Sequence, residues 1–415
     1  MRQLILMCVF LLPFMAVQAQ ETTPDVFPGG VLESAFVETQ TTEAINAIID
    51  HFYPVEQRVA AEYAVDIYHV VLQSTNEQGE TFPVFAQLFV PQVDEAAELP
   101  VFVLGAGSSG LVDACAPSQE DPNVQNWGSY KAYMLSIATR GYLAILPDYA
   151  GFSDGDPETI QPYYVSAMAG HVLLDAGRAV YSLFAPDAGY VDSPATPAQS
   201  VFLAGYSQGG QSIFAAKDLW QTYAPDLPLA GVVGYAPVTN MQSHMLHLPQ
   251  LAPYRMYAWK GYYGDVVDLD AIFADTWLPT LEADVLRLCV IDAAGYFSSS
   301  LDELYRPEFA NALREGTLAQ DYPELDALFE LNNPGFVQNE IPALIVQGDQ
   351  DATIPLPDHE AFVELYCAAG NHATDMVLEG MNHFHAREVS YREVVAWMQT
   401  VAAGEPVPDV CAGDS

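Results

Sequence analysis

The chain has few basic residues for its length. Its 13 Lys and Arg stand against 54 Asp and Glu, which gives a formal charge of −41 over 415 residues. A chain with this charge repels nucleic acid and anionic lipid surfaces, so we expect it to bind neither. We interpret the acidic excess as a feature that keeps the protein soluble, because no local motif supports the alternative of a specific cationic substrate.

Long apolar runs are also scarce, since only the N-terminus has one. Residues 1–20 combine Arg2, an apolar middle, and small residues at Val17 and Ala19, the pattern of a signal peptide cleaved after Ala19. The run is too short to span a bilayer comfortably. We therefore expect a secreted or extracytoplasmic protein without a stable membrane anchor, and a retained N-terminal anchor is the less favoured alternative.

The sequence has five cysteines and no Cys-x-x-Cys pair, which argues against zinc and redox motifs. Cys8 leaves with the signal peptide, and Cys115, Cys289, Cys367 and Cys411 remain. An even number of cysteines in an exported chain predicts two disulfides, and free buried thiols are the alternative.

The order of apolar runs predicts a doubly wound, mostly parallel α/β sheet. Residues 64–74 and 82–91 resemble two strands of a hairpin, and helical patterns alternate with the later runs. Short, almost continuous apolar runs are typical of parallel strands that are buried on both faces. These runs are residues 100–107, 142–149, 201–207, 230–237, 342–349 and 375–380.

One long segment, from about Asn240 to Gln338, has no convincing strand but many aromatic residues and short helical pieces. It is too long for an ordinary loop, so we expect a mainly helical cap inserted before the strand that carries the catalytic acid. The expected division is a signal peptide (1–19), an N-terminal arm packed on the body (20–60), the first part of the core (61–239), the cap (240–338), the second part of the core (339–404) and a C-terminal tail (405–415).

The segment Gly205-Tyr206-Ser207-Gln208-Gly209 lies where an apolar strand becomes a helix. It has the Gly-x-Ser-x-Gly pattern, in which glycines permit a sharp turn that projects the serine hydroxyl beyond the sheet. The turn also places the amide of Gln208 at a helix N-terminus, where it can stabilise a developing oxyanion. We expect Ser207 to be a nucleophile; the alternative is a structural turn.

A serine nucleophile needs a histidine base and a carboxylate that orients it. Asp349 and Asp351 follow one late strand, and His383 and His385 follow the last. We favour Asp351 as the carboxylate, because Asp349 lies in the turn itself. We favour His383 as the base, because it comes three residues after Gly380. The alternative, that His383 and His385 form half of a metal site, lacks a third ligand cluster.

The second oxyanion donor is expected from the glycine-rich loop Gly105–Gly110 after an early strand, and the amide of Ser108 is the best candidate. A flexible glycine loop without this role is the alternative. His171, His359 and His372 fall on or beside helices and are expected to be surface or packing residues.

These motifs resemble the α/β-hydrolase superfamily, and more closely its secretory lipase family. The resemblance depends on "GYSQGG", "LPDYAGFSDG", "PYYVSAMAGHVLLDAGRA" and "PALIVQGDQDATIPLPDHEAFVELYCAAG", and covers about residues 65–403. It implies a triad of Ser207, Asp351 and His383. The chain departs from related hydrolases at Ala106-Gly107, where His-Gly is frequent.

The expected function is hydrolysis of a small-molecule or lipid carboxylic ester through an acyl-enzyme, without a cofactor. A peptidase or aminopeptidase of the same fold is the alternative, because acidic cap residues such as Glu282 and Asp284 could hold a free amino terminus. A non-catalytic binding protein is less favoured, since no triad residue is missing. The sequence does not indicate an oligomeric state.

The expected fold also suggests how the cysteines pair. Cys115 follows the oxyanion loop and Cys289 belongs to the cap above it, so we expect them to join. Cys367 ends a helix, and Cys411 lies in a Pro-rich tail that would otherwise fray, which favours a second bridge between these two.

Overall fold

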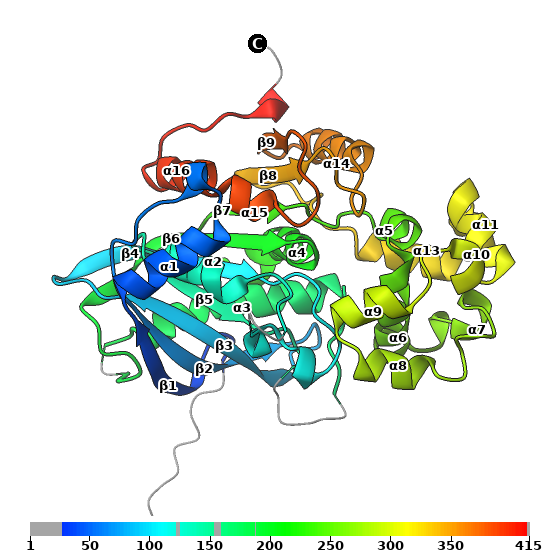
Figure 1. Cartoon of the computed structure of the whole chain (residues 1–415), viewed down its shortest axis with the longest axis horizontal. Helices are drawn as coiled ribbons and strands as arrows, with labels where there is room; N and C mark the ends of the chain where they lie inside the picture. Colours follow the sequence, from blue (N-terminus) through cyan, green and yellow to red (C-terminus); the bar gives the residue numbers. More distant parts are fainter. Residues whose placement is uncertain (1–26, 122–124, 153–158, 187, 413–415) are drawn as a thin grey trace, which may run out of the picture.

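The computed structural model describes residues 27–121, 125–152, 159–186 and 188–412, so the expected signal peptide (1–19) lies outside the described residues. At its centre is one nine-stranded sheet with the strand order β1-β2-β3-β5-β4-β6-β7-β8-β9 (Figure 1). The pairs from β1 to β5 along this order are antiparallel, and all later pairs are parallel. The strands are β1 (Val31–Gln40), β2 (Val65–Thr75), β3 (Thr81–Pro91), β4 (Ala97–Gly105), β5 (Leu143–Pro147), β6 (Ala195–Tyr206), β7 (Leu229–Tyr235), β8 (Ala343–Gly348) and β9 (Ala373–Leu378). The predicted α/β fold class is confirmed.

Alternate side chains of the strands face two separate hydrophobic cores. In β4, Val101 and Val103 belong to one core, and Phe102 and Leu104 belong to the other. The first core is covered by α3, α4 and α14, and the second by α1, α2 and α16. These helices and the short α15 are α1 (Thr42–Phe52), α2 (Tyr130–Ala138), α3 (Ser166–Leu183), α4 (Gln208–Tyr223), α14 (Leu356–Ala368), α15 (Ala386–Val389) and α16 (Tyr391–Ala402). Burial on both faces explains why the inner strands are apolar throughout.

The N-terminal segment contributes a strand that the sequence analysis did not expect. Residues 31–40 form β1, which pairs antiparallel with β2 at the edge of the sheet. Only Val31 of this strand is buried, and two register shifts interrupt the pairing. The alternation of apolar and polar residues is therefore too weak to indicate a strand.

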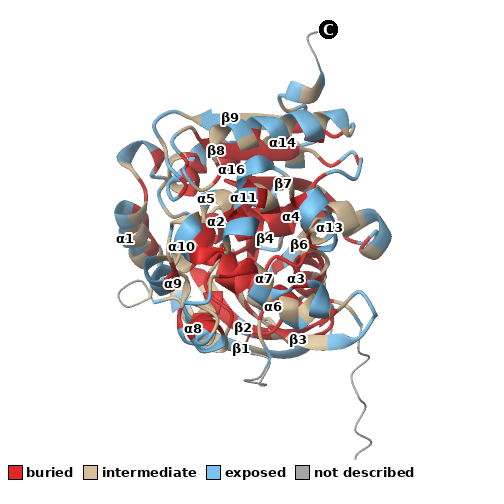
Figure 2. Cartoon of the chain, turned by 90° about the vertical axis from the view of Figure 1, so that its right-hand side faces the viewer, coloured by how far each residue is buried: buried red, intermediate tan, exposed pale blue. Residues whose placement is uncertain are grey.

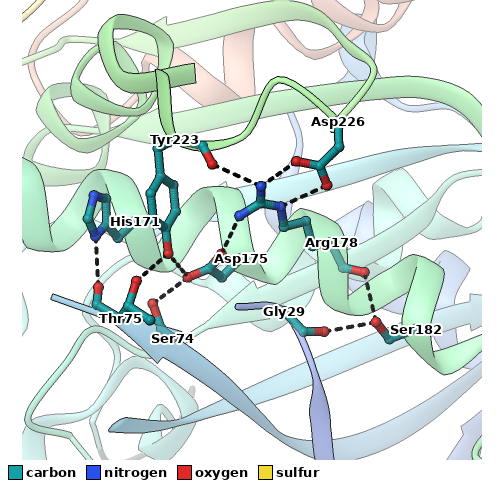
Figure 3. Close-up of polar contacts among 9 residues, drawn as sticks. All are labelled: Gly29, Ser74, Thr75, His171, Asp175, Arg178, Ser182, Tyr223 and Asp226. Atoms are coloured by element: carbon teal, nitrogen blue, oxygen red, sulfur yellow. Dashed lines mark hydrogen bonds and ion pairs between the residues drawn. The ribbon is translucent and has the colours of Figure 1, made fainter. Parts of the chain in front are cut away.

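A buried polar network joins α3 to the sheet and to α4 (Figure 3). The carboxylate of Asp175 accepts hydrogen bonds from Ser74 on β2 and Tyr223 on α4, both at 2.7 Å. Arg178 also donates to Asp175, at 3.2 Å, and the ring of His171 stacks on Tyr223 with 3.7 Å between centroids. His171 is therefore a packing residue, and the network fixes the two helices that flank the carboxyl end of β6.

The segment between β7 and β8 is helical and lies at one end of the molecule, on the right in Figure 1. Seen from that end, its helices have exposed outer surfaces around buried segments (Figure 2). Within the described residues, no helix is both long and apolar enough to cross a membrane. The inserted helices are α5 (Met241–His247), η4 (Pro249–Leu251), α6 (Ala252–Tyr263), η5 (Gly264–Val266), α7 (Leu269–Ile272), α8 (Leu281–Arg287), α9 (Val290–Tyr296), α10 (Leu301–Leu304), α11 (Pro307–Glu315), α12 (Leu318–Asp321) and α13 (Pro323–Leu331).

Two disulfides join distant segments in the pairing expected from the sequence. Cys115 in η2 (Asp113–Cys115) is bonded to Cys289, just before α9, with 5.4 Å between the Cα atoms. Cys367 on α14 is bonded to Cys411 in η6 (Val410–Ala412). The first bridge ties the inserted helices to the loop after β4, and the second holds the C-terminal segment against α14.

We expect replacement of Cys115 and Cys289 by serine to lower the free energy of unfolding by about 2–5 kcal/mol. The bridge spans 174 residues of sequence, so its loss frees a long loop in the unfolded chain. Replacing Cys367 and Cys411 is the matched control, because that bridge spans 44 residues and chain-entropy reasoning makes its effect about 1 kcal/mol smaller. Chemical unfolding of both variants measures the difference, and four alkylatable thiols in the native protein would contradict the pairing.

Candidate active site

Ser207 lies in a sharp turn between the end of β6 and the start of α4. Its backbone has φ 55° and ψ −110°, a strained conformation that is typical of functional sites. Only glycine fits on either side: a Cβ atom on Gly205 would lie 2.0 Å from the carbonyl oxygen of Gly209. A Cβ atom on Gly209 would lie 1.9 Å from the carbonyl oxygen of Gly105. The close packing of these backbones explains the Gly-x-Ser-x-Gly spacing.

The side chains of Ser207, His383 and Asp351 form a continuous hydrogen-bonded line. His383 Nε2 lies 3.0 Å from Ser207 Oγ, and His383 Nδ1 lies 2.8 Å from Asp351 Oδ2. All three side chains are buried, although they come from three different loops at the carboxyl ends of β6, β8 and β9. This is the arrangement in which a histidine can take a proton from a serine while a carboxylate orients its ring.

Asp351 is held as an ionised carboxylate. Its Oδ1 accepts hydrogen bonds from the backbone N–H groups of Thr353 and Ile354, both at 2.8 Å. Burial by itself raises the pKa of Asp351, but the hydrogen bond and charge of His383, together with these two N–H groups, outweigh it and hold the pKa below its usual value. The carboxylate can therefore stabilise a positive charge on the imidazole.

The alternatives considered in the sequence have other partners. Asp349 accepts a hydrogen bond from the backbone N–H of Gly380 at 2.7 Å, the turn role expected for it. The exposed His385 contacts Asn382, with 2.7 Å between His385 Nδ1 and the amide oxygen. Neither side chain contacts Ser207 or His383 by a hydrogen bond in the described structure.

The remaining histidines of the sequence analysis also lie in structural contacts. His359 is buried and contacts Asp375 at 2.8 Å, and the half-exposed His372 contacts Asp409 at the same distance. In the described part of the chain, no three His, Cys, Asp or Glu side chains gather in a group that could hold a metal ion. The His383-x-His385 pair therefore has no third ligand among the described residues.

The two expected oxyanion donors lie at the same end of the sheet. Gln208 is the first residue of α4, and Ser108 follows the end of β4. Among the described residues, neither backbone N–H donates to a protein acceptor, whereas the adjacent N–H of Gly107 donates to the Tyr130 hydroxyl at 2.8 Å. Both N–H groups are thus free to bind a ligand oxygen.

A cavity of about 430 Å³ opens over Ser207 and His383. The core contributes polar groups to its wall, including Ser108 and Arg387. The inserted helices and their connections contribute only apolar side chains: Leu248, Leu251, Val290, Ile291 and Ala294. The cavity therefore combines a polar reactive end with an apolar wall.

The acidic cap residues that favoured an aminopeptidase lie elsewhere. Asp284 forms an ion pair with Arg287 at 2.7 Å and accepts a hydrogen bond from Tyr296 at 3.1 Å. Glu282 lines a separate cavity of about 910 Å³, whose lining contains neither Ser207 nor His383. Neither carboxylate is therefore placed to bind an amino terminus beside Ser207.

Arg387, which was not among the residues expected from the sequence, lines the cavity and is buried among three aromatic rings. Its guanidinium lies 4.7 Å from the ring of Tyr206, 5.2 Å from Tyr130 and 5.5 Å from Tyr133. It also donates a hydrogen bond to the carbonyl of Gly128 at 2.5 Å. The rings come from distant segments of the chain, so no local pattern could have indicated this contact.

Comparisons with known proteins find relatives named as lipases and esterases. Residues 126–250 match the family described as secretory lipase. A trichothecene C-3 esterase from Fusarium sporotrichioides is 26% identical over 322 residues, which are 72% of this chain and 64% of that protein. A protein of Mycobacterium tuberculosis named as a probable inactive lipase is 26% identical over 369 residues, which are 82% of this chain and 74% of that protein. The chain spans less than two thirds of the length of the Fusarium esterase.

Among solved structures, the rice cell wall degrading esterase LipA from Xanthomonas oryzae superposes with a TM-score of 0.70. It covers 91% of this chain and 97% of its own at 17% sequence identity, a level at which the likeness shows the fold alone. The chain therefore has the α/β-hydrolase fold and resembles the secretory lipase family across the segment that carries Ser207.

Proposed function

We propose that this chain is an exported serine hydrolase that cleaves carboxylic esters through an acyl-enzyme. The observation that carries the proposal is the line of hydrogen bonds from Asp351 through His383 to Ser207. The N–H groups of Gln208 and Ser108, which have no acceptor among the described residues, support it. The related proteins named as esterases and lipases support the same class of reaction. The relative named as inactive makes a direct test of activity necessary.

In the proposed acylation step, Ser207 Oγ attacks the ester carbonyl carbon while His383 Nε2 takes the hydroxyl proton. The carbonyl electrons move to the oxygen, which accepts hydrogen bonds from the amides of Gln208 and Ser108. Collapse of this intermediate breaks the bond to the alcohol, which leaves with the proton from His383. Asp351 remains ionised and stabilises the imidazolium.

Deacylation repeats these steps with water as the nucleophile. His383 Nε2 takes a proton from water, the resulting oxygen nucleophile attacks the acyl carbonyl, and the proton passes to Ser207 Oγ as the acid leaves. Only side chains, backbone amides and water take part, so the proposed reaction requires no cofactor.

We further propose an exported protein with a core of residues 61–239 and 339–404 and a cap of residues 240–338. The signal-peptide pattern of residues 1–19 supports export, and two disulfides are typical of proteins that fold in oxidising compartments. The disulfide between Cys115 and Cys289 would hold the cap close to the loop of Ser108.

The apolar wall of the cavity favours an ester with an apolar acyl or alcohol part. Ile291 and Phe384, which are 62% and 65% exposed, give the opening of this cavity an apolar border. Burial of a substrate methylene against such a surface contributes about 0.8 kcal/mol, so longer chains should bind more tightly until the cavity is full.

A series of p-nitrophenyl esters from acetate to palmitate, assayed below and above substrate solubility, tests this proposal. We expect kcat/KM to rise with acyl length over the first members, by up to about fourfold per methylene group if each is fully buried. Amino-acid p-nitroanilides form the control, because they release the coloured p-nitroaniline from an amide bond. Faster cleavage of the anilides than of the esters would indicate a peptidase and overturn the esterase proposal. Absence of cleavage in both series would support a non-catalytic role.

A further inference from the structure

Tyr164 has an unusual backbone conformation next to Tyr163, whose hydroxyl contacts the expected oxyanion loop at Ser108. It lies two residues before α3, and its φ of 59° places it in the left-handed region. A bulky aromatic residue rarely adopts this conformation, because its Cβ atom crowds the backbone. The side chain is 1% exposed. Strain of this kind persists where the surrounding structure holds a side chain in a required position.

The hydroxyl of Tyr164 is buried and has no hydrogen bond of normal geometry within the described structure. Its neighbour Tyr163 differs, since the Tyr163 hydroxyl lies 2.6 Å from Ser108 Oγ. Buried polar groups almost always have a partner, and the exceptions need an explanation. A ligand oxygen that is present only during the reaction would provide one.

The surroundings of Tyr164 include the expected oxyanion loop: its ring packs against that of Tyr163 with 4.5 Å between centroids, and the Tyr163 hydroxyl contacts Ser108. Burial raises the pKa of the Tyr164 phenol, and the charge of Arg255 only partly opposes the rise. The phenol therefore keeps its proton at neutral pH and can donate it in a hydrogen bond. Ser108 lines the cavity together with Ser207, so Tyr164 lies next to a residue that borders the expected oxyanion position.

A buried arginine, Arg255, packs against the face of the Tyr164 ring. The Arg255 guanidinium lies 4.6 Å from the ring centroid, donates to the carbonyl of Met241 at 2.9 Å, and contacts His244. No carboxylate forms an ion pair with Arg255 among the described residues. A fixed positive charge in a buried site stabilises nearby negative charge strongly, because little water screens it.

We propose that the Tyr164 hydroxyl donates a third hydrogen bond to the oxyanion, beside the amides of Gln208 and Ser108, and that Arg255 holds the tyrosine ring in place. The proposal rests on the proposed ester hydrolysis and adds a side-chain donor to it. A donor of this kind acts on the charge that develops in the transition state, so it changes kcat and leaves substrate binding almost unchanged.

The test is Tyr164→Phe, which keeps the ring packed against Arg255 and His244 and removes only the hydroxyl. We expect kcat for p-nitrophenyl butyrate to fall by about 10- to 100-fold with KM changed by less than about threefold. Butylboronic acid forms a negatively charged tetrahedral adduct with an active serine. Its inhibition constant should rise by a factor similar to the loss in kcat, which a merely structural role would not produce.

Tyr305→Phe is the matched control, because Tyr305 is a buried tyrosine near Arg255 whose hydroxyl donates to the carbonyl of Met245 at 3.1 Å. We expect its kcat and its inhibition constant to stay within about twofold of the unmodified enzyme. Unchanged kcat and boronate inhibition in Tyr164→Phe would overturn the third donor while the esterase proposal stands. An unmodified protein that cleaves no ester would overturn both.

Discussion

Replacing Ser207 with alanine is expected to lower kcat for ester hydrolysis by about four to six orders of magnitude. The change removes the only hydroxyl that lies within hydrogen-bond distance of His383 Nε2 in the described structure. It should leave the fold intact, since alanine keeps the backbone turn and Ser207 Oγ donates to no other protein group there. Steady-state kinetics with p-nitrophenyl butyrate, together with the thermal unfolding midpoint, measures both effects.

Ser212→Ala is the matched control on the same helix. Ser212 is buried one turn further along α4, and its hydroxyl donates to the carbonyl of Gln208 at 2.9 Å. We expect this variant to keep kcat within about threefold. If Ser207→Ala retains more than about a hundredth of the activity at an unchanged midpoint, Ser207 is not the nucleophile.

The residues around Ser207 could be predicted because their pattern is local. A strand, two glycines and a helix lie within residues 201–216, and the close approach of Gly205 to Gly209 requires that spacing. The positions of Asp351 and His383 also followed from the sequence, because the carboxyl ends of parallel strands meet at one edge of the sheet. The chemistry of the turn then distinguished Asp351 from Asp349.

Features that depend on distant contacts could not be predicted in this way. The edge strand β1 is mostly exposed and pairs with β2 after 24 intervening residues, so its own residues carry little signal. The ring contacts of Arg387 and the strained backbone of Tyr164 exist only after separate segments have packed. Neither residue has a local sequence pattern that indicates these contacts.

Replacing Asp351 with asparagine is expected to lower kcat by about four orders of magnitude, with little change in the shape of the site. The asparagine oxygen can occupy the position of Oδ1 and accept from the backbone N–H groups of Thr353 and Ile354. Its NH₂ group then takes the place of Oδ2 and donates to His383 Nδ1, and the hydrogen bond that Oδ2 accepts from Gln347 Nε2 at 3.0 Å is lost. The imidazole must carry its proton on Nε2, so it can no longer accept the proton of Ser207.

The same substitution at Asp349 tests whether this effect is specific. Asp349→Asn keeps a side-chain oxygen for the backbone N–H of Gly380 and does not touch the imidazole, so kcat should stay within about threefold. The protonation of His383 can be followed directly by ¹⁵N NMR, which should show the proton moving from Nδ1 to Nε2 in Asp351→Asn alone. Near-normal turnover in Asp351→Asn, or a large loss in Asp349→Asn, would mean that Asp349 and not Asp351 is the carboxylate of the triad. A loss of turnover without a change of tautomer would mean that Asp351 acts mainly through the negative charge it provides to the imidazolium.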